Sequence, residues 1–547
     1  MISWLNKLRP APDHPMRDVK AAQTILDQLP RTDPHKYVLE VAAWIESVTQ
    51  ASGFRLSNRA AIIRLLDEAG YPLQRKLQQE YLPQNRQSRL REQAVWKALV
   101  DYWRALVNAY LFCLDASAMN AREAESVKPA LPLLCARALH AAGCMYKTML
   151  LHYGPVDDSV WHGLSRIWLF VEGHQLQDVQ VGLYPHLQRP TTARIEFTKP
   201  LMLACSSAHS LLPPQIDLAE RMIDDVASHF VMGNEPDSRS AFVYDLAVPR
   251  PPSRLVAGMM VTPRMRFVGP GMASVRLEEL SRVLDNPAAV SAAGFSYAAS
   301  AVSLRTVLQH LLFYWSMSPP ERQWPRMPVF GRLTVVHGYA NVMRSVLFSK
   351  FDIAPAPQAT RDLLLRQKHD LEQFGFVTNE TQQLMDTARD EDADDLQAEN
   401  WLVQNVSLGG YGAVLPALRS DWLRVGCLLA VRGAQGDWQI GVVRRLHFDA
   451  ERQTHVGIEI LAARLTPVRI RPASTPRRDD SEEYALLFAL SLAGMTSGTL
   501  LVRAGNSQPG QTYLLSGPDQ PVRVEWAALR ERGEEFELVE FRVLSQE

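Results

Sequence analysis

Cysteine is scarce in this chain, with five residues among 547, and the five are Cys113, Cys135, Cys144, Cys205 and Cys427. No two of them form a CxxC pair or a Cys/His cluster with the spacing of metal ligands. This distribution argues against a structural zinc site and against a disulfide framework. Their mostly apolar neighbours predict buried free thiols in a reducing compartment, so we expect a cytoplasmic protein.

Long uncharged apolar runs are also missing. The most apolar long stretch, residues 293–317, contains Arg305, Gln309 and His310. A membrane-spanning helix needs about 20 mostly apolar residues with few charges. The N-terminus has no apolar core of the length found in signal peptides. Membrane insertion is therefore not expected.

Neither sign of charge dominates, because 58 Lys and Arg residues face 59 Asp and Glu residues, for a net charge of -1. Such a chain has no overall field that would recruit nucleic acid, so neither DNA nor RNA is an expected partner. Walker, GxSxG and HExxH motifs do not occur in the sequence. We therefore predict no catalytic residues, no metal and no cofactor, and the chain is not expected to be an enzyme.

The chain is too long for one hydrophobic core, so several domains are expected. Residues 1–230 show apolar stripes at helical spacing. In one of them Asp33-Pro34 forms a start signal, and Tyr37, Val41, Trp44 and Val48 share a face. In the next segment Ser57 is the expected N-cap and Gly70 the expected end. These patterns predict an α-helical bundle or an irregular solenoid.

The remaining segments are expected to differ in character. Prolines interrupt short apolar runs at 240–275, which is compatible with an ordered connection or with a few short strands. Strand-like alternation begins at Val329 and returns at Trp401. The expected domains are a mixed, mostly helical connection at 231–317, a β-barrel at 318–340 and 400–473, a helical insertion at 341–399, and a small β-rich unit at 474–547.

Two separated motifs flank strands of the expected barrel. Arg322 and Arg326 precede the first strand, and the pattern Asn-x-Ser-x-x-Gly follows the second, formed by Asn405, Ser407 and Gly410 with Gly409 beside it. An arginine side chain is a planar, permanently charged fork that can hold a phosphate at two points and stack on a purine. Glycines at a turn let a ligand approach the main chain.

Together these motifs resemble the signature of PilZ domains, which are bacterial receptors for cyclic di-GMP. The resemblance covers about residues 319–340 and 400–473. It implies a PilZ-like antiparallel β-barrel and cyclic di-GMP as the ligand. By the resemblance, Arg322 and Arg326 contact phosphate and guanine, Asn405 and Ser407 meet a guanine edge, and Gly409 and Gly410 shape the turn.

Arg444 is a candidate for an additional basic contact in this site. The competing interpretation is structural, with the arginine paired to a carboxylate such as Glu459. The insertion at 341–399 carries more apolar residues than a surface connection requires, among them Leu364, Leu371 and Phe374. Two roles are therefore expected as alternatives for this insertion: self-association, giving a homo-oligomer, or covering the barrel.

The fold class expected is a multidomain protein: a large all-α N-terminal region, a PilZ-like antiparallel β-barrel interrupted by a helical insertion, and a small β-rich C-terminal unit. The expected function is a cytoplasmic cyclic di-GMP receptor that relays ligand binding to an unidentified protein partner through its helical region. The alternative is a protein-interaction scaffold whose degenerate barrel binds no nucleotide. A third reading, an enzyme with an unrecognised pocket in the helical region, stays open.

Overall fold

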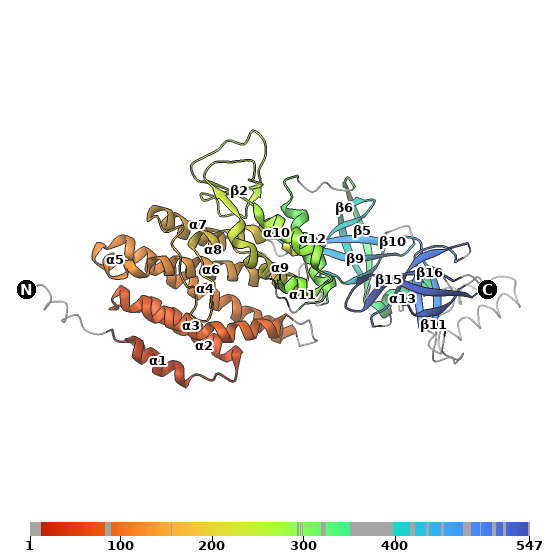
Figure 1. Ribbon diagram of the computed structural model, residues 1–547. Coiled ribbons are helices and arrows are strands. Elements are labelled where there is room, and N and C mark those ends of the chain that lie inside the picture. Colours follow the sequence, from red (N-terminus) through yellow and green to blue (C-terminus); the bar gives the residue numbers. More distant parts are fainter. Residues whose placement is uncertain are drawn as a thin grey trace, which may run out of the picture. The chain divides into compact units, whose positions relative to one another are not determined.

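The chain divides into two compact units, residues 1–321 and 322–547, and each is described by itself (Figure 1). The computed structural model describes residues 12–82, 89–154, 156–292, 295, 297, 299–318, 324–350, 398–415, 422–433, 437–449, 453–473, 483–492, 494–505, 510–517 and 521–544. Among the helices in these ranges, none is both long enough and apolar enough to cross a membrane.

The first unit is mainly helical, as the sequence predicts. Its first helices are α1 (Val19–Gln28), α2 (Pro34–Gln50), α3 (Leu56–Tyr81), α4 (Arg89–Met119), α5 (Ala121–Val127), α6 (Leu131–Leu150), α7 (Asp158–Gly173), α8 (Ala193–Cys205) and α9 (Pro213–Val226). The start signal of α2 is confirmed, because the Asp33 side chain accepts a hydrogen bond from the backbone N–H of Lys36. Tyr37, Val41 and Val48 of its apolar stripe are buried.

The expected limits of α3 are wrong at both ends. The helix begins one residue before Ser57, and its first backbone N–H, on Leu56, donates to the Glu123 carboxylate from α5 at 3.0 Å. It also continues through Gly70 to Tyr81. Gly70 lies inside the helix because α4 packs closely there: a Cβ at this position would be 2.7 Å from the Tyr102 hydroxyl. Glycine here serves close packing instead of ending the helix.

The prolines between 240 and 275 separate short strands. The sequence was compatible with an ordered connection or with a few short strands, and the structure has the strands. The strands form an antiparallel sheet in the order β1-β4-β2-β3, with bounds β1 (Val231–Gly233), β2 (Phe242–Asp245), β3 (Ser253–Arg254) and β4 (Met265–Gly269). The helices α10 (Met272–Val283), α11 (Pro287–Ala292) and α12 (Ala301–Trp315) follow.

The second unit contains two closed antiparallel barrels, so the expected fold class is confirmed. The first barrel has the strand order β10-β7-β6-β5-β8-β9. Its strands are β5 (Met327–His337), β6 (Glu399–Ser407), β7 (Gly410–Leu415), β8 (Leu428–Gly433), β9 (Gln439–Phe448) and β10 (Thr454–Ala462).

The second barrel has the strand order β11-β12-β13-β16-β15-β14. Its strands are β11 (Thr466–Pro472), β12 (Glu483–Leu487), β13 (Ser497–Arg503), β14 (Thr512–Ser516), β15 (Val522–Arg532) and β16 (Phe536–Val543). Strand β11 was expected to belong to the first barrel, which the sequence extended to residue 473. It pairs instead with β12 and β14. A buried strand has the same apolar pattern in either barrel, so only the pairing assigns it.

Helix α13 (Tyr339–Lys350) follows β5 and begins the expected insertion. Residues 351–397, which include Leu364, Leu371 and Phe374, lie outside the described residues. Val342 and Val346 of α13 belong to a buried cluster that also contains Ile440 of the first barrel and Leu538 of the second. Helix α13 and both barrels thus contribute to one shared hydrophobic cluster, and the second barrel also has an interior cluster of its own, which includes Leu500, Trp526 and Phe541.

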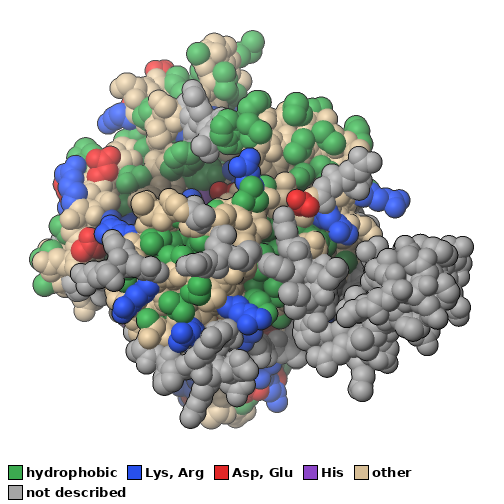
Figure 2. Space-filling view, turned by 90° about the vertical axis from the view of Figure 1, so that its right-hand side faces the viewer, with side chains coloured by type: hydrophobic (Ala, Val, Ile, Leu, Met, Phe, Trp, Pro, Cys, Tyr) green, Lys and Arg blue, Asp and Glu red, His purple; other side chains and the backbone are tan. Residues whose placement is uncertain are grey.

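The described part of the face in Figure 2 carries charged side chains in small groups. Figure 2 shows Lys and Arg side chains in several separate places on the face it displays, with hydrophobic side chains between them. On the described part of this face, the basic side chains do not merge into one continuous patch. Capture of an anion therefore depends on local geometry, which directs attention to the motif residues.

Candidate functional site

Arg326 of the first motif lies next to the strand that carries the second motif, at one end of the first barrel. Strand β5 pairs antiparallel with β6, with Met327 opposite Val406 and Pro328 opposite Asn405. Extending this register by one residue places the backbone of Arg326 opposite Ser407. The long stretch of chain between β5 and β6 therefore does not separate the two motifs in space, because the strands that carry them are neighbours.

Trp324 provides an independent measure of this proximity. A Cβ built on Gly409 would lie 3.1 Å from Cδ1 of Trp324. The same register, continued along the chain, places Trp324 opposite Gly409. Trp324 is 42% exposed, so its side chain is partly accessible next to the turn. The described residues before β5 thus bring an aromatic ring to the polar turn, and this residue is not part of either sequence motif.

The side chains of the polar turn are held by their neighbours. Asn405 pairs with Gly412 across β6 and β7, and its amide lies over that glycine, within 2.7 Å of a built Cβ. The Ser407 hydroxyl is 3.4 Å from the carbonyl oxygen of Gly410, to which it donates. Both side chains are partly buried, and Arg326 is exposed. The arrangement presents amide and hydroxyl groups beside an arginine.

Gly410 is required by its surroundings. Its φ is 156°, and a Cβ built there would lie 1.9 Å from the carbonyl oxygen of Ile458 in β10. No side chain fits into that space. The second glycine of the motif therefore allows β7 to pair with β10 directly after the turn.

The two other expected site residues are Arg322 and Arg444. Arg322 lies outside the described residues. Arg444 contacts Glu459, the carboxylate named from the sequence, with Nε to Oε2 at 2.5 Å, and it also contacts Glu531 of the second barrel. Its guanidinium is therefore held by two carboxylates, as in the structural interpretation. Burial opposes the charge of Arg444, but Glu531 and Glu459 raise its pKa overall.

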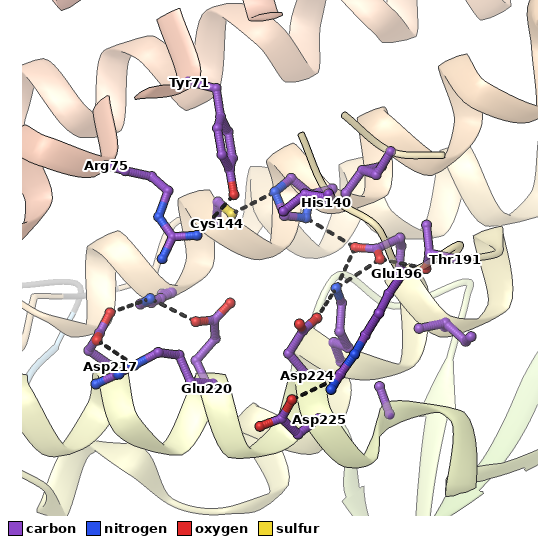
Figure 3. A pocket seen from close by; sticks show the side chains of 18 of the residues that line it. Tyr71, Arg75, His140, Cys144, Thr191, Glu196, Asp217, Glu220, Asp224 and Asp225 are labelled. Carbon is purple, nitrogen blue, oxygen red and sulfur yellow. Dashed lines mark hydrogen bonds and ion pairs between the residues drawn. The ribbon is translucent and has the colours of Figure 1, made fainter. Parts of the chain in front are cut away.

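A large cleft in the first unit is a second candidate site, and the sequence did not reveal it. Its volume is about 1140 Å³, and α3, α6, α8 and α9 supply most of its polar lining (Figure 3). His140, Cys144 and Lys147 recur on one face of α6 at helical spacing. This polar stripe in an otherwise apolar helix is the signal that could have indicated the cleft.

Acidic and basic side chains alternate in this cleft. Lys147 contacts Asp217 at 2.7 Å and Glu220 at 2.8 Å. Lys199 contacts Glu196 at 2.7 Å and Asp224 at 2.8 Å. The cleft thus carries balanced charge with fixed donors and acceptors. Within the described part of the chain, no group of three or more His, Cys, Asp and Glu residues is arranged to hold a metal ion.

Comparison with known families matches two parts of the chain. Residues 20–237 match the family model described as the N-terminal domain of cyclic-di-GMP receptor FimW, and residues 346–467 match its middle PilZ domain. Together the two stretches cover more than half of the chain. Arg322 and Arg326 lie between them. No curated protein matches the chain.

Proposed function

Because the chain belongs to the family of PilZ-domain cyclic di-GMP receptors, we propose that it is a cytoplasmic receptor whose first barrel binds the dinucleotide beside β5 and β6. The observation that carries this proposal is the register that sets Arg326 opposite Ser407. Arg326 and Arg322 hold phosphate and stack on guanine, and Asn405 and Ser407 meet a guanine edge. A guanine edge offers both acceptors and a donor, which an amide and a hydroxyl can match.

Trp324 adds a contact to this proposed site. Its ring lies against Gly409 and is partly exposed. A purine is a flat π-system, and stacking on an aromatic side chain stabilises a bound base by about 1–3 kcal/mol. The ring is therefore placed to stack on a guanine that enters between the arginine segment and the polar turn.

The same segment supports a mechanism for relay. The two compact units meet in sequence at residues 321 and 322, so the segment with both arginines is the covalent connection between them. Ordering five residues costs on the order of 5–10 kcal/mol, and four charge-assisted contacts return about 6–12 kcal/mol. The free energy of the contacts therefore exceeds the cost of ordering by a small margin, and ligand binding orders this connection. An ordered connection restricts the positions that the helical unit can take when it binds a protein partner.

Calorimetric titration of the full chain with cyclic di-GMP tests the binding site. We expect Arg326→Ala and Arg322→Ala each to weaken binding at least tenfold, because each removes at least one charge-assisted contact of about 1.5–3 kcal/mol. Arg332→Ala is the matched control, since Arg332 is an exposed arginine on the same strand, opposite Leu402. Unchanged affinity of Arg326→Ala would refute the assignment. Absence of binding by the unmodified chain would support the scaffold alternative.

Limited proteolysis tests the relay. Cyclic di-GMP should slow cleavage between residues 316 and 326 in the unmodified chain, and this protection should be lost in Arg326→Ala. Protection elsewhere with no change in this segment would count against an ordered connection. Such a result would leave ligand binding itself intact, so the two parts of the proposal can be judged separately.

A further inference from the structure

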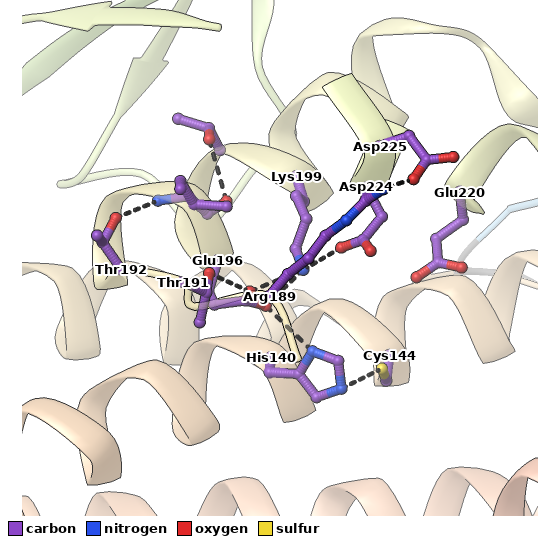
Figure 4. Close-up of polar contacts among 12 residues, drawn as sticks. His140, Cys144, Arg189, Thr191, Thr192, Glu196, Lys199, Glu220, Asp224 and Asp225 are labelled. Carbon is purple, nitrogen blue, oxygen red and sulfur yellow. Dashed lines mark hydrogen bonds and ion pairs between the residues drawn. The ribbon is translucent and has the colours of Figure 1, made fainter. Parts of the chain in front are cut away.

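Three side chains on the wall of the helical cleft form a chain of hydrogen-bond contacts, from a cysteine to a histidine to a glutamate. Sγ of Cys144 lies 3.5 Å from Nε2 of His140, and Nδ1 of His140 lies 3.1 Å from Oε2 of Glu196 (Figure 4). Cys144 and His140 share one face of α6, and Glu196 comes from α8. A nucleophile within reach of a base that a third group orients is the arrangement that activates cysteine in catalysis.

The orienting carboxylate is firmly fixed. Glu196 is 1% exposed, and its Oε1 accepts a hydrogen bond from the Thr191 hydroxyl at 2.7 Å. Helices α6 and α8 are in contact beside Cys144, since a Cβ built on the neighbouring Gly143 would lie 3.6 Å from the Pro200 ring, an ordinary van der Waals distance. The contact between the two helices therefore holds the three groups in register.

The charges around His140 favour its protonated form. Burial alone would lower the pKa of His140, but Cys144 and then Glu196 raise it well above its ordinary value. Burial would likewise raise the pKa of Glu196, but Lys199 and His140 lower it to about 2. An imidazole at hydrogen-bond distance from a thiol can exchange a proton with it as the sulfur reacts.

The other cysteines have different surroundings. Burial raises the pKa of Cys113 and of Cys135 to about 12, and it also raises that of Cys205. Cys427 is partly buried like Cys144, but its thiol donates to the Trp422 carbonyl at 3.3 Å, and burial raises its pKa to about 11. In the described part of the chain, Cys144 is the one thiol with an imidazole at hydrogen-bond distance.

Trp103 gives a second, independent observation in the same cleft. It lines the cavity, is 1% exposed, and meets His140 edge-on with ring centroids 6.0 Å apart. Among the described residues, none accepts a hydrogen bond from its indole N–H. Buried donors almost always have an acceptor. An unsatisfied donor beside a nucleophile and a base is a group to which the oxygen of a bound molecule can bind.

We propose that Cys144, His140 and Glu196 form an acyl-transfer site in the helical unit that takes esters as substrates. The sulfur of Cys144 attacks the carbonyl carbon, the carbon–oxygen bond to the leaving alcohol breaks, and His140 gives that alcohol its proton. Water then adds to the thioester while His140 takes a proton. The carbon–sulfur bond breaks, and a carboxylic acid and the thiol are released. Glu196 is a positioning residue for His140.

The size and charge of the cleft limit the substrate. Small-molecule sites are usually about 300–1,000 Å³, so a cleft of about 1140 Å³ has room for a substrate larger than a simple metabolite. Its lining carries both signs of charge, including Lys147 on the nucleophile's own helix and Glu220 on α9. The site therefore fits a polar acyl compound with groups of either charge better than a lipid.

The first test uses the unmodified full chain. Its cysteines compete for iodoacetamide, and mass spectrometry measures how fast each cysteine is alkylated. We expect Cys144 to react at least tenfold faster than the equally partly buried Cys427. His140→Gln should remove this advantage and change its pH profile, and Glu196→Gln should change the profile less. Cys144 reacting no faster than Cys427 would overturn the proposal, and this comparison requires no variant to fold.

Acetyl transfer is the second test, with 4-nitrophenyl acetate as the probe. The full chain should release a burst of nitrophenol stoichiometric with protein and carry the acetyl group on Cys144. Cys144→Ser should abolish the burst and Cys427→Ser should retain it. An equal burst in Cys144→Ser would refute the proposal. Titration with cyclic di-GMP should be unchanged in both variants, so failure here is distinct from failure of the receptor site.

Discussion

In the second unit, the guanidinium of Arg444 holds the carboxylate of Glu531 at two points, with Nη1 to Oε1 at 2.6 Å and Nη2 to Oε2 at 2.7 Å. Arg444 lies in β9 of the first barrel and Glu531 in β15 of the second. The same guanidinium contacts Glu459, which stands opposite Gly410 of the polar turn. A continuous run of contacts therefore leads from the candidate ligand site to the second barrel.

Removing the carboxylate of Glu531 should weaken the contact between the two barrels. The pair is partly exposed, so Glu531→Gln should lower the free energy of unfolding by only about 1 kcal/mol. Glu525→Gln, which changes a carboxylate elsewhere on β15, is the control. Urea unfolding of Arg444→Met, Glu531→Gln and the double variant measures the coupling. Strictly additive effects would show that the two residues do not stabilise each other.

The adjacent glycines of the turn should respond differently to alanine. Gly410→Ala would place Cβ 1.9 Å from a backbone oxygen of β10, so it should destabilise the unit by about 2–4 kcal/mol. Gly409→Ala would meet the side chain of Trp324 at 3.1 Å and no backbone atom among the nearest described ones, so it should weaken cyclic di-GMP binding with little loss of stability. Thermal unfolding and calorimetry distinguish the two effects. Equal loss of stability in both variants would contradict this assignment.

Two helical glycines should give opposite results in the first unit. A Cβ on Gly70 would lie 2.7 Å from the ring of Tyr102, which is fully buried and cannot move aside. Gly70→Ala should therefore cost about 1–3 kcal/mol in spite of alanine's better helix propensity. Gly173, in α7, has no atom within 4 Å of a built Cβ, so Gly173→Ala should be neutral or stabilising by up to about 1 kcal/mol. Denaturant midpoints of both variants measure the difference.

Acid should weaken the helical unit partly through Glu196. Its pKa in the folded chain is about 2, against an ordinary value of 4.5, because Lys199 and His140 outweigh the effect of burial. The folded pKa is the lower one, so this stabilisation is present above pH 4.5 and is lost as the pH falls toward 2. The shift corresponds to about 3 kcal/mol. The free energy of unfolding of the full chain, measured from pH 6 to pH 3, should fall less steeply in Glu196→Gln. Identical slopes would contradict the role of Glu196.

Much of the fold could be predicted from the sequence because its signals are local. The cap at Asp33 and the stripe of α2 depend on residues within a few positions of one another. The polar turn after Ser407 was likewise readable, since adjacent glycines follow it in the sequence, and at Gly410 the close approach of Ile458 leaves no room for a side chain. The limits of α3 were not readable, because Glu123 and Tyr102, which determine them, come from other helices.

The sequence by itself determined the helical and barrel character of the chain and the motif residues near the turn, since short-range periodicity and turn chemistry suffice for those. Only the tertiary structure decided that β11 belongs to the second barrel, that Arg444 is held by Glu531, and that Glu196 stands behind His140 and Cys144. Each of these relationships joins segments far apart in the chain. The closure of barrels and the packing of helices select such partners, and no local pattern encodes them.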